Sequence, residues 1–543
     1  MPNTELASGD VALAYGACAA GVGLVTGYPG SPSSGTVDAL LEMPEASAMQ
    51  ITWAINECIA LEMAYGASIA GRRALLCVKS VGLNIALDPL MTMVLTGCKA
   101  GLVILLGDDP GGWASQNEQD TRLLAILADI PLLEPATPQE AQDTLIEAFD
   151  LSERHGLPVI VRETRALALA EGPVERRPAR ATVNTPYARE PKRWISLPEN
   201  VVENHRRLRC KMEALQQELE SSVLNRIAGD GRLGVVACGS TGLKLRQALG
   251  PERLSHFCVL SLGTFHPLPA GLVTRYLARV DTALVFEENE GYIEQKLAAL
   301  AHEAGLGTRL LGRGSGHLPV GGELDAAQIV SAVVRLKPEW AGELGAPAVG
   351  TRAMPSQKPL CPDCPYRPLF EALLECIDEA GGRERTIIVG EPGCMVRAYY
   401  PPYELLDVKY SLGASLGLAV GLATSHPGPK VVALTGDSSF LHHGWGGLVE
   451  AARSRADLLA IVLDNSTTAL SGRQPHAGTA YDARQQSATA LDLAELARAV
   501  APGVQTIDPL DREATRLALR RALGRSGLDV LIARSPCPRM PLG

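Results

Sequence analysis

Two apolar segments in the last third of the chain, Lys430-Val-Val-Ala-Leu-Thr-Gly-Asp437 and Asp457-Leu-Leu-Ala-Ile-Val-Leu-Asp464, decide the fold. Each is a short, continuous apolar run that stops at an acid, the pattern of a strand buried on both faces. The residues between them, Gly444 to Arg455, have helical composition. This order predicts a βαβ unit, in which a right-handed helical crossover joins two parallel strands.

The polar residues that directly follow the two strands are expected to meet. Parallel strands place their carboxyl ends at one edge of the sheet, where open α/β sheets bind ligands. Asp437, Asn465 and the backbone carbonyl of Thr467 then offer three oxygen donors, which suit the octahedral coordination of Mg²⁺. The alternative is that Asp437 caps the helix that follows and Asn465 turns the chain, which are the usual roles of such residues.

Composition sets the class of protein. The chain has 543 residues, 46% hydrophobic and 20% charged, with a net charge of −10. This length suits three or four globular domains, and the acidic balance argues against a nucleic-acid-binding surface. No apolar run reaches the roughly eighteen residues that cross a membrane, and the polar N-terminus excludes an ordinary secretory signal. We therefore expect a cytoplasmic protein that binds neither nucleic acid nor membrane.

The twelve cysteines lie mostly inside apolar runs, which is typical of reduced, buried thiols. Only Cys361-Pro-Asp-Cys364 has the spacing of a metal-binding pair. A zinc ribbon or a cubane cluster needs two more cysteines at short spacing, and Cys376 and Cys394 are poor candidates for them. The spacing therefore completes neither kind of site, and it leaves the role of Cys361 and Cys364 open.

Gly436-Asp437-Ser438, followed after twenty-five residues by Asp464-Asn465, resembles the thiamine diphosphate motif. The continuation from Leu463 to Gly478 resembles the alpha subunit of indolepyruvate ferredoxin oxidoreductase, within the 2-oxoacid:ferredoxin oxidoreductase family. This resemblance implies an α/β fold of three doubly wound parallel-sheet domains with transketolase-like architecture. It also implies bound thiamine diphosphate and Mg²⁺.

Two more loops of the last third match the family's cofactor site. Gly390 to Cys394 stands where the family places a loop beside the cofactor. Gly413 lies where a glycine-rich helix begins, and its N-terminal amides are suited to a diphosphate. The resemblance thus assigns cofactor binding to Glu57, Gly393, Cys394, Gly413, Gly436, Asp437, Ser438, Ser439, Asn465 and Thr467, with Asp437, Asn465 and Thr467 holding the metal.

The first 172 residues predict a further α/β domain, with strand-like runs at 24–26, 74–79, 102–106 and 158–162. The loop Gly27-Tyr-Pro-Gly-Ser-Pro-Ser-Ser34 follows the first run, and we expect its three serine hydroxyls to be exposed. Its composition alone is that of a loop that begins a helix. It resembles a family loop, and the resemblance implies that the Ser31 hydroxyl binds the substrate carboxylate.

Glu57 opens a helix at Asn56-Glu57-Cys58. An acid is favoured near any helix N-terminus by the helix dipole, so this position has a purely structural explanation. The family places a glutamate at this point, however. The resemblance implies that Glu57 hydrogen-bonds N1′ of the aminopyrimidine and so promotes removal of the thiazolium C2 proton. Ser80 and Tyr366 each stand where the family carries histidine.

The resemblance also divides the chain into domains. His266, in the third-domain sequence Leu262-Gly-Thr-Phe-His-Pro-Leu-Pro269, is expected to be structural. The predicted segments are a pyrimidine-binding domain at 1–172, a linker and helix at 173–231, a transketolase C-terminal-like domain at 232–337, a linker at 338–360 and a diphosphate- and Mg²⁺-binding domain at 361–543.

The resemblance implies oxidative decarboxylation of an aryl 2-oxoacid such as indolepyruvate to an acyl-coenzyme A. The family's alpha subunit continues into a ferredoxin-like domain with two clusters, whereas this sequence stops at Gly543. The resemblance therefore implies no iron–sulfur cluster in this chain. We therefore expect a beta-type subunit or a ferredoxin to take the electrons, in a homo-oligomer or an α2β2 assembly. The alternatives are a non-oxidative decarboxylase or carboligase, and a cofactor-binding pseudoenzyme or scaffold subunit.

Overall fold

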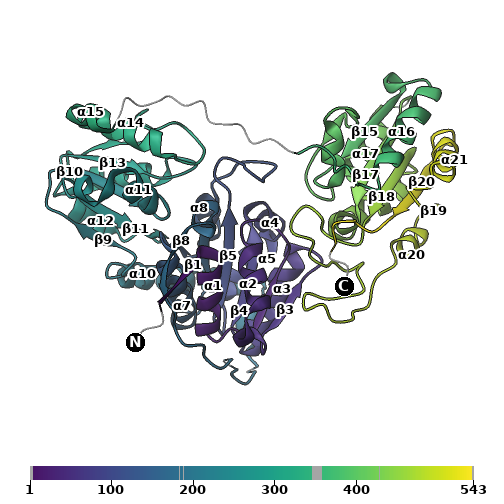
Figure 1. Ribbon diagram of the computed structural model, residues 1–543. Coiled ribbons are helices and arrows are strands. Elements are labelled where there is room, and N and C mark those ends of the chain that lie inside the picture. The colour runs from purple at the N-terminus through teal and green to yellow at the C-terminus, as the bar shows by residue number, and fades with distance from the viewer. Residues whose placement is uncertain (1–3, 183, 188, 345–357, 427, 541–543) are drawn as a thin grey trace. The chain divides into compact units, whose positions relative to one another are not determined.

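Parallel β-sheets organise the protein. A computed structural model describes residues 4–182, 184–187, 189–344, 358–426 and 428–540 (Figure 1). The chain divides into two compact units. The described residues of the first lie within 4–51 and 57–344, and those of the second lie within 52–56 and 358–540. No helix in these described ranges is long and apolar enough to cross a membrane.

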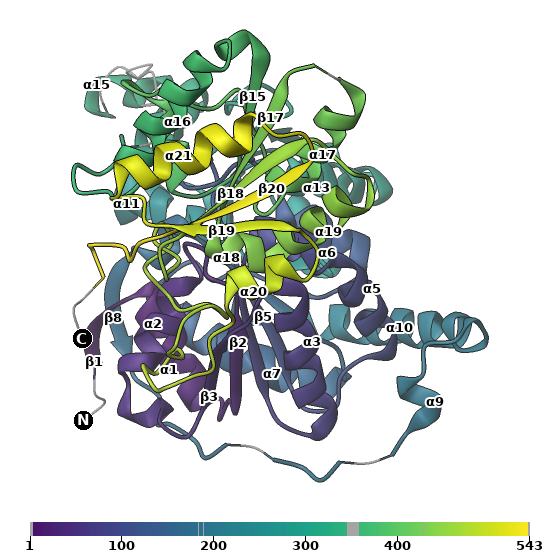
Figure 2. The same cartoon turned by 90° about the vertical axis from the view of Figure 1, so that its right-hand side faces the viewer.

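The first unit contains a seven-stranded sheet with the order β12-β6-β7-β5-β4-β2-β3. Strands β2, β4, β5, β7 and β6 run parallel, and β12 pairs antiparallel with β6. Figure 2 shows α1 and α2 on one side of these strands and α3 and α5 on the other. The strands are β2 (Leu24–Gly27), β3 (Gln50–Trp53), β4 (Ala74–Lys79), β5 (Leu102–Asp108), β6 (Leu132–Leu133), β7 (Val159–Thr164) and β12 (Thr264–His266).

The four strand runs predicted in the first 172 residues are confirmed as β2, β4, β5 and β7. Every residue of these strands is buried, as expected for central strands of a parallel sheet. The associated helices are α1 (Gly9–Ala19), α2 (Ser34–Glu42), α3 (Glu57–Ala70), α4 (Ser80–Ile85), α5 (Leu87–Thr96), α6 (Thr121–Ala128), α7 (Pro138–His155) and α8 (Arg165–Ala168).

The first unit also contains a five-stranded sheet with the order β14-β13-β10-β11-β9, in which only β9 is antiparallel. Its strands are β9 (Arg226–Ala228), β10 (Leu233–Cys238), β11 (Cys258–Leu262), β13 (Thr282–Phe286) and β14 (Arg309–Leu311). Its helices are α11 (Thr241–Leu254), α12 (Ala270–Leu277), α13 (Tyr292–Glu303), α14 (Ala326–Leu336) and α15 (Ala341–Leu344).

The connection between the two sheets differs from the expected linker and single helix. A two-stranded antiparallel ribbon forms from β1 (Thr4–Ser8) and β8 (Glu171–Glu175), followed by α9 (Pro191–Trp194) and α10 (Pro198–Leu219). Helix α10 ends at Leu219, and residues 226–228, within the segment expected to be a linker and helix, form the strand β9 instead. The predicted domain boundaries remain predictions. The compact first unit contains residues of two predicted domains, 1–172 and 232–337.

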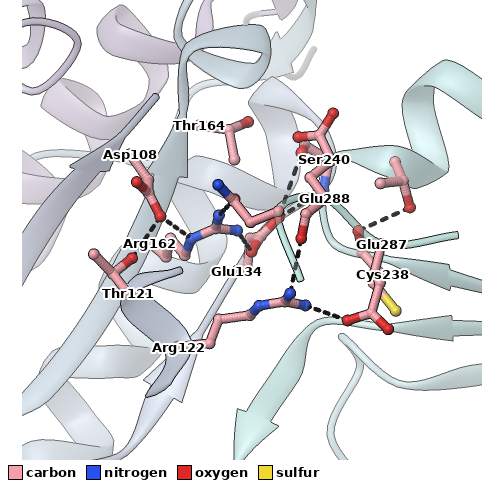
Figure 3. A network of polar contacts seen from close by, with 12 residues as sticks. Asp108, Thr121, Arg122, Glu134, Arg162, Thr164, Cys238, Ser240, Glu287 and Glu288 are labelled. Atoms are coloured by element: carbon pink, nitrogen blue, oxygen red, sulfur yellow. Dashed lines mark hydrogen bonds and ion pairs between the residues drawn. The ribbon is translucent and has the colours of Figure 1, made fainter. Parts of the chain in front are cut away.

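A buried network of charges joins the two sheets of the first unit (Figure 3). Arg122 donates to Glu287 Oε2 at 2.8 Å, and Arg162 donates to Asp108 Oδ2 at 2.8 Å and to Glu134. All five side chains are at most 2% exposed. Burial raises the pKa of Glu134 and of Glu287, while the two arginines oppose that rise. Pairing with arginine therefore offsets part of the cost of burying these carboxylates.

The second unit contains a six-stranded parallel sheet with the order β16-β15-β17-β18-β20-β19. Separate apolar clusters cover it, one built from α16 and α21 and the other from α17, α19 and α20. Its strands are β15 (Thr386–Gly390), β16 (Val408–Lys409), β17 (Lys430–Gly436), β18 (Leu458–Asp464), β19 (Gly503–Ile507) and β20 (Leu528–Arg534). Its helices are α16 (Arg367–Glu379), α17 (Ser415–Ser425), α18 (Asp437–Ser439), α19 (Trp445–Arg453), α20 (Leu493–Arg498) and α21 (Arg512–Leu523).

The βαβ unit that decides the fold is confirmed. Strands β17 and β18 are parallel neighbours, and Gly436 pairs with Leu463 at their carboxyl ends. The connecting helical segment starts earlier than the expected Gly444, because α18 begins at Asp437 and a π-helical turn covers Phe440–Gly444. Asp437 therefore directly follows a strand and is the first residue of a helix.

A pair of acids, Asp10 and Glu163, predicts that the free energy of unfolding depends on pH. Glu163 is fully buried at the end of β7, and its carboxyl faces that of Asp10 on α1, with Asp38 and Cys77 nearby. Burial raises the pKa of Asp10 to about 7 and that of Glu163 well above its ordinary value. In this pair the folded protein holds protons that an unfolded chain releases near pH 4.

We therefore expect the free energy of unfolding to fall as pH rises from about 4 to about 7, because the folded state binds more protons across this window. The Glu163→Gln variant should show a shallower fall, since it removes one of the coupled groups. Urea unfolding at several pH values measures the slope. The exposed control Glu199→Gln should leave it unchanged, and a Glu163→Gln slope equal to the wild-type slope would contradict the assignment.

Candidate cofactor and substrate site

Asp437 lies at the carboxyl edge of the six-stranded sheet and is 2% exposed. Its Oδ2 accepts hydrogen bonds from the backbone N–H of Asn465 at 3.0 Å and of Ser466 at 2.8 Å, and its Oδ1 accepts one from Ser438 N–H at 2.8 Å. Ser438 belongs to the helix that follows β17, and Asn465 and Ser466 belong to the loop that follows β18. The carboxylate is thus held in one orientation where the strand ends meet.

Asn465 and Thr467 are brought to the same place. Thr467 N–H donates to Asn465 Oδ1 at 3.2 Å, and the two residues are 6% and 1% exposed. The turning role is therefore present at Asn465, whereas the N-cap of α18 is Gly436 and no side chain caps that helix, so the capping role expected of Asp437 is wrong. Asp437 and Asn465 instead accept the hydrogen bonds given above. These bonds are compatible with a metal site as well, because a carboxylate has about four acceptor positions and an amide oxygen has two.

The donor set fits Mg²⁺ chemically. A buried carboxylate, an amide oxygen and a backbone carbonyl are hard ligands that leave positions for water and phosphate. Among the described residues, no three His, Cys, Asp or Glu side chains could share one metal ion. A site formed here would therefore depend on amide and carbonyl oxygens beside the single acid Asp437.

His476 was not assigned a role from the sequence, yet it belongs to this site. Its Nε2 lies 3.2 Å from Asp437 Oδ2, and its side chain is 6% exposed. Gly478 N–H donates to its Nδ1 at 3.1 Å, which orients the ring. A histidine in a long loop after a strand carries no periodic signal, and only its presence in the family-like continuation to Gly478 pointed to this segment.

Gly413 and Gly393, predicted to contact the cofactor, both lie in the second unit. Gly413 has φ +73°, and a Cβ there would come within 2.6 Å of His443 Cβ and 3.1 Å of Ser439 O. This glycine lets the start of α17 approach the helical segment that follows Asp437. A Cβ on Gly393 would come within 2.7 Å of Met395 Sδ.

Cys394 is close to the candidate metal ligands, since Asn465 Nδ2 lies 3.9 Å from its Sγ. Cys537 N–H donates to the Asn465 carbonyl at 3.1 Å, so a second cysteine reaches the same residue. Burial raises the pKa of the Cys394 thiol to about 12, and Cys364 and Cys537 act on it from nearby. The Cys361 Sγ accepts from Arg397 at 3.2 Å.

These contacts gather four thiols from three places in the sequence: the neighbouring pair Cys361 and Cys364, Cys394, and Cys537. All four are partly exposed, whereas Cys376, the other candidate weighed from the sequence, is buried on α16 against α21. Burial raises the pKa of Cys364 to about 11, with Cys361 and Cys537 contributing. Sequence spacing could not reveal this group because Cys537 follows the last strand of the sheet.

Glu57 begins α3 in the first unit and is 6% exposed. Its carboxyl packs against Gly82 of α4, where an added Cβ would lie 2.4 Å from Glu57 Oε1 and 2.8 Å from Cδ. Ser80, the residue in place of the family histidine, starts α4 and is 3% exposed. Glycine at position 82 therefore leaves the room that the Glu57 carboxyl fills.

The serine loop has one exposed hydroxyl side chain, not the three expected. Ser34 Oγ accepts from Gly30 N–H at 2.7 Å, and Ser33 Oγ donates to the Gly30 carbonyl at 3.1 Å. Ser33 and Ser34 are buried by this turn, which begins α2, whereas Ser31 is exposed. The two alternatives thus apply to different residues: Ser33 and Ser34 build the turn, and Ser31 is accessible to a ligand.

His266 makes the structural contact expected of it. Its Nε2 lies 2.9 Å from Asp129 Oδ1, and the side-chain hydrogen bond lowers the pKa of Asp129. Tyr366, the other residue in place of a family histidine, is 1% exposed in the core cluster of α16.

Two family models match the chain. Residues 15–216 match "Pyruvate flavodoxin/ferredoxin oxidoreductase, thiamine diP-bdg", and residues 391–533 match "Thiamine pyrophosphate enzyme, C-terminal TPP binding domain". The indolepyruvate oxidoreductase subunit IorA of Methanothermobacter thermautotrophicus is 35% identical, over 97% of this chain and 86% of that protein. The chain belongs to the IorA family of indolepyruvate oxidoreductase subunits.

Other members of the family have a similar sequence identity and coverage. The Archaeoglobus fulgidus subunit is 33% identical over 97% of this chain, and the Pyrococcus abyssi subunit is 32% identical over 98% of it, each covered to 86%. A solved 2-oxoglutarate:ferredoxin oxidoreductase from Magnetococcus marinus has a TM-score of 0.50 at 18% identity, covering 62% of this chain and 65% of that one. The likeness confirms the α/β fold.

A glycine substitution tests the placement of Glu57 in this thiamine diphosphate-binding family. Gly82→Ala should displace the Glu57 carboxyl and lower turnover by about tenfold or more, while the protein stays folded. The control is Gly66→Ala on α3, where an added Cβ meets no atom within 4 Å. Steady-state turnover and circular dichroism measure the two effects. Equal turnover of Gly82→Ala and Gly66→Ala would contradict the importance of this packing.

Proposed function

We propose that this protein catalyses oxidative decarboxylation of an aryl 2-oxoacid such as indolepyruvate to an acyl-coenzyme A. The full-length similarity to indolepyruvate oxidoreductase subunits carries the proposal. Glu57, Asp437 and Asn465 support it, because all are present and buried. They also argue against a pseudoenzyme or scaffold, in which activation and metal-binding residues are free to change. Electron transfer to a beta-type subunit or ferredoxin, an oligomeric assembly and a cytoplasmic location are part of this proposal.

The chain's own residues have distinct tasks in this mechanism. Thiamine diphosphate, when bound, supplies an electron sink for the loss of CO₂ from a 2-oxoacid. Asp437, Asn465 and the Thr467 carbonyl would hold Mg²⁺, and thereby the diphosphate, at the strand ends of the second unit. Gly393, Gly413, Gly436, Ser438 and Ser439 would line the same end of the cofactor.

Glu57 would hydrogen-bond N1′ of the aminopyrimidine and hold the proton there. A buried carboxyl suits this task, because exclusion of water strengthens its hydrogen bonds. The exposed Ser31 hydroxyl would donate a hydrogen bond to the substrate carboxylate. The neighbouring Ser33 and Ser34 hydroxyls are already used in the turn, which leaves Ser31 as the group accessible to a ligand.

The decisive measurement is turnover of the purified chain with Mg²⁺, thiamine diphosphate, indolepyruvate, coenzyme A and a dye acceptor. We expect coenzyme A-dependent dye reduction. Glu57→Gln should lose about a hundredfold or more of the turnover, within the range of general acid–base contributions. Glu62→Gln is the matched control, since Glu62 is an exposed acid on the same helix.

Asp437→Asn should weaken binding of Mg²⁺ and thiamine diphosphate, measured by calorimetry.

In the turnover assay, aldehyde release without acceptor or coenzyme A would support the non-oxidative decarboxylase instead of the oxidoreductase. Failure of the wild-type protein to bind the cofactor would exclude both enzyme functions.

The gathered thiols favour a revision of the cofactor prediction. We propose that Cys361, Cys364, Cys394 and Cys537 hold an iron–sulfur cluster, which would carry electrons from the cofactor site when bound. The prediction of no cluster rested on the resemblance to a family whose clusters lie in a ferredoxin-like domain, whereas these four thiols suit a cubane because each cysteine binds a different iron. The contact of Cys394 with Asn465 gives this group a position beside the metal ligands.

Anaerobic purification and analysis of iron and sulfide test the cluster. We expect about four irons per chain, with an absorbance that disappears on reduction. Cys361→Ser and Cys394→Ser should lose most of the iron, whereas the buried control Cys376→Ser should retain it. An iron-free wild-type protein after anaerobic reconstitution would return the assignment to the sequence prediction.

A further inference from the structure

Lys79 is a buried cation whose function no motif assigned. It ends β4 and is 7% exposed. Its Nζ donates to the Ala114 carbonyl at 2.8 Å and lies 3.7 Å from Asp109 Oδ2. Burial lowers the pKa of this ammonium, and Asp109 opposes the shift. A lysine is rarely buried without a task, because removing its charge from water is costly.

The stem of Lys79 packs against the serine loop. A Cβ added to Gly30 would lie 2.9 Å from Lys79 Cβ and 3.5 Å from its Cδ. Gly30 is the residue whose N–H and carbonyl bond the Ser34 and Ser33 hydroxyls. The Lys79 stem therefore contacts the loop directly beside Ser31, the candidate ligand of the substrate carboxylate.

The ammonium end of Lys79 holds a different loop, the turn from Asp109 to Ser115 after β5. Asp109 Oδ2 accepts from Ala114 N–H and from Ser115 Oγ, each at 2.8 Å. Ala114 is thus held on both sides, with its N–H on Asp109 and its carbonyl on Lys79. Asp109 Oδ1 is buried and has no hydrogen-bond partner among the described residues, so the carboxylate keeps an acceptor for a further donor.

The turn also contacts the segment between β14 and α14 of the same unit. Trp113 Nε1 donates to Glu323 Oε2 at 2.7 Å, and the Arg165 guanidinium lies 5.5 Å from the Trp113 ring centre. Glu118, just beyond the turn, accepts from Gly322 N–H at 2.7 Å. The Asp109–Ser115 turn is therefore anchored at one side by Glu323 and at the other by Lys79.

We propose that Lys79 is a positioning residue for the 2-oxoacid, which holds the Asp109–Ser115 turn against the Ser31 loop so that both contact the substrate. The inference rests on the proposed function, because it takes the Ser31 loop as the carboxylate site. Lys79 contacts both loops, through its stem at Gly30 and its ammonium at Ala114. Loss of the ammonium frees the turn and loosens substrate binding, while the cofactor residues keep their places.

The test compares Lys79→Met with the wild-type protein and with Lys79→Arg. Methionine keeps much of the apolar stem and removes the charge, whereas arginine keeps a donor. Lys211→Met is the matched control, since Lys211 is also partly buried and donates its Nζ to a carbonyl, that of Gly156, at 3.0 Å. Two readouts apply: KM and kcat for indolepyruvate, and hydrogen exchange of the Asp109–Ser115 amides in the free protein.

We expect Lys79→Met to raise KM about tenfold or more, with kcat changed less than about threefold and thiamine diphosphate affinity unchanged. Amides of the turn should exchange faster, Lys79→Arg should recover part of the KM, and Lys211→Met should match the wild type. Unchanged exchange in the turn, or an equal KM increase in Lys211→Met, would overturn the role of Lys79. Absence of wild-type turnover would overturn the proposed function instead, and the exchange result would still decide whether Lys79 holds the turn.

Discussion

The first unit depends on two arginines buried between its sheets. Arg122 donates to Asp120, Glu287 and the Glu288 carbonyl, and Arg162 donates to Asp108 and Glu134. Loss of one partner in such a network costs about 3–5 kcal/mol, because a charge stays buried without compensation. Such a network therefore serves to orient the segments that it joins more than to raise the net stability of the protein. Asp108 ends β5 and Arg122 lies in α6, so the network fixes both ends of the loop that contains the Asp109–Ser115 turn.

A second constraint acts at the carboxyl ends of the parallel strands. A strand buried on both faces has little room for polar side chains along its length, so these collect where it ends. Lys79, Asp108 and Glu163 occupy such positions in the seven-stranded sheet, and Asp437 and Asn465 follow strand ends in the six-stranded sheet. Small residues at the same edges admit large neighbours, as Gly82 does for the Glu57 carboxyl. One rule of sheet construction thus supplies the candidate functional groups of both units.

Sequence patterns predicted the features that depend on residues close together in the chain. Continuous apolar runs located β17 and β18, and parallel pairing then brought Asp437 beside Asn465. The antiparallel pairing of β12 with β6 was not predictable, because these strands are three and two residues long and far apart in sequence. The thiol group was missed for the same reason, since Cys537 reaches Asn465 only through the register of β20. Exposure of Ser33 and Ser34 was overestimated because composition does not show which hydroxyl a turn will use.

Structural hydrogen bonds and metal binding need not exclude each other at Asp437. Backbone N–H groups of Ser438, Asn465 and Ser466 satisfy part of its carboxylate and hold its plane at the strand ends. That orientation is the preorganisation that a small cation such as Mg²⁺ requires, because its octahedral geometry tolerates little ligand movement. The same logic applies to Asp109, whose Oδ2 is fully used in a turn while Oδ1 is not. In both acids, backbone hydrogen bonds hold the carboxylate in one orientation, so that its remaining acceptor positions point in a fixed direction.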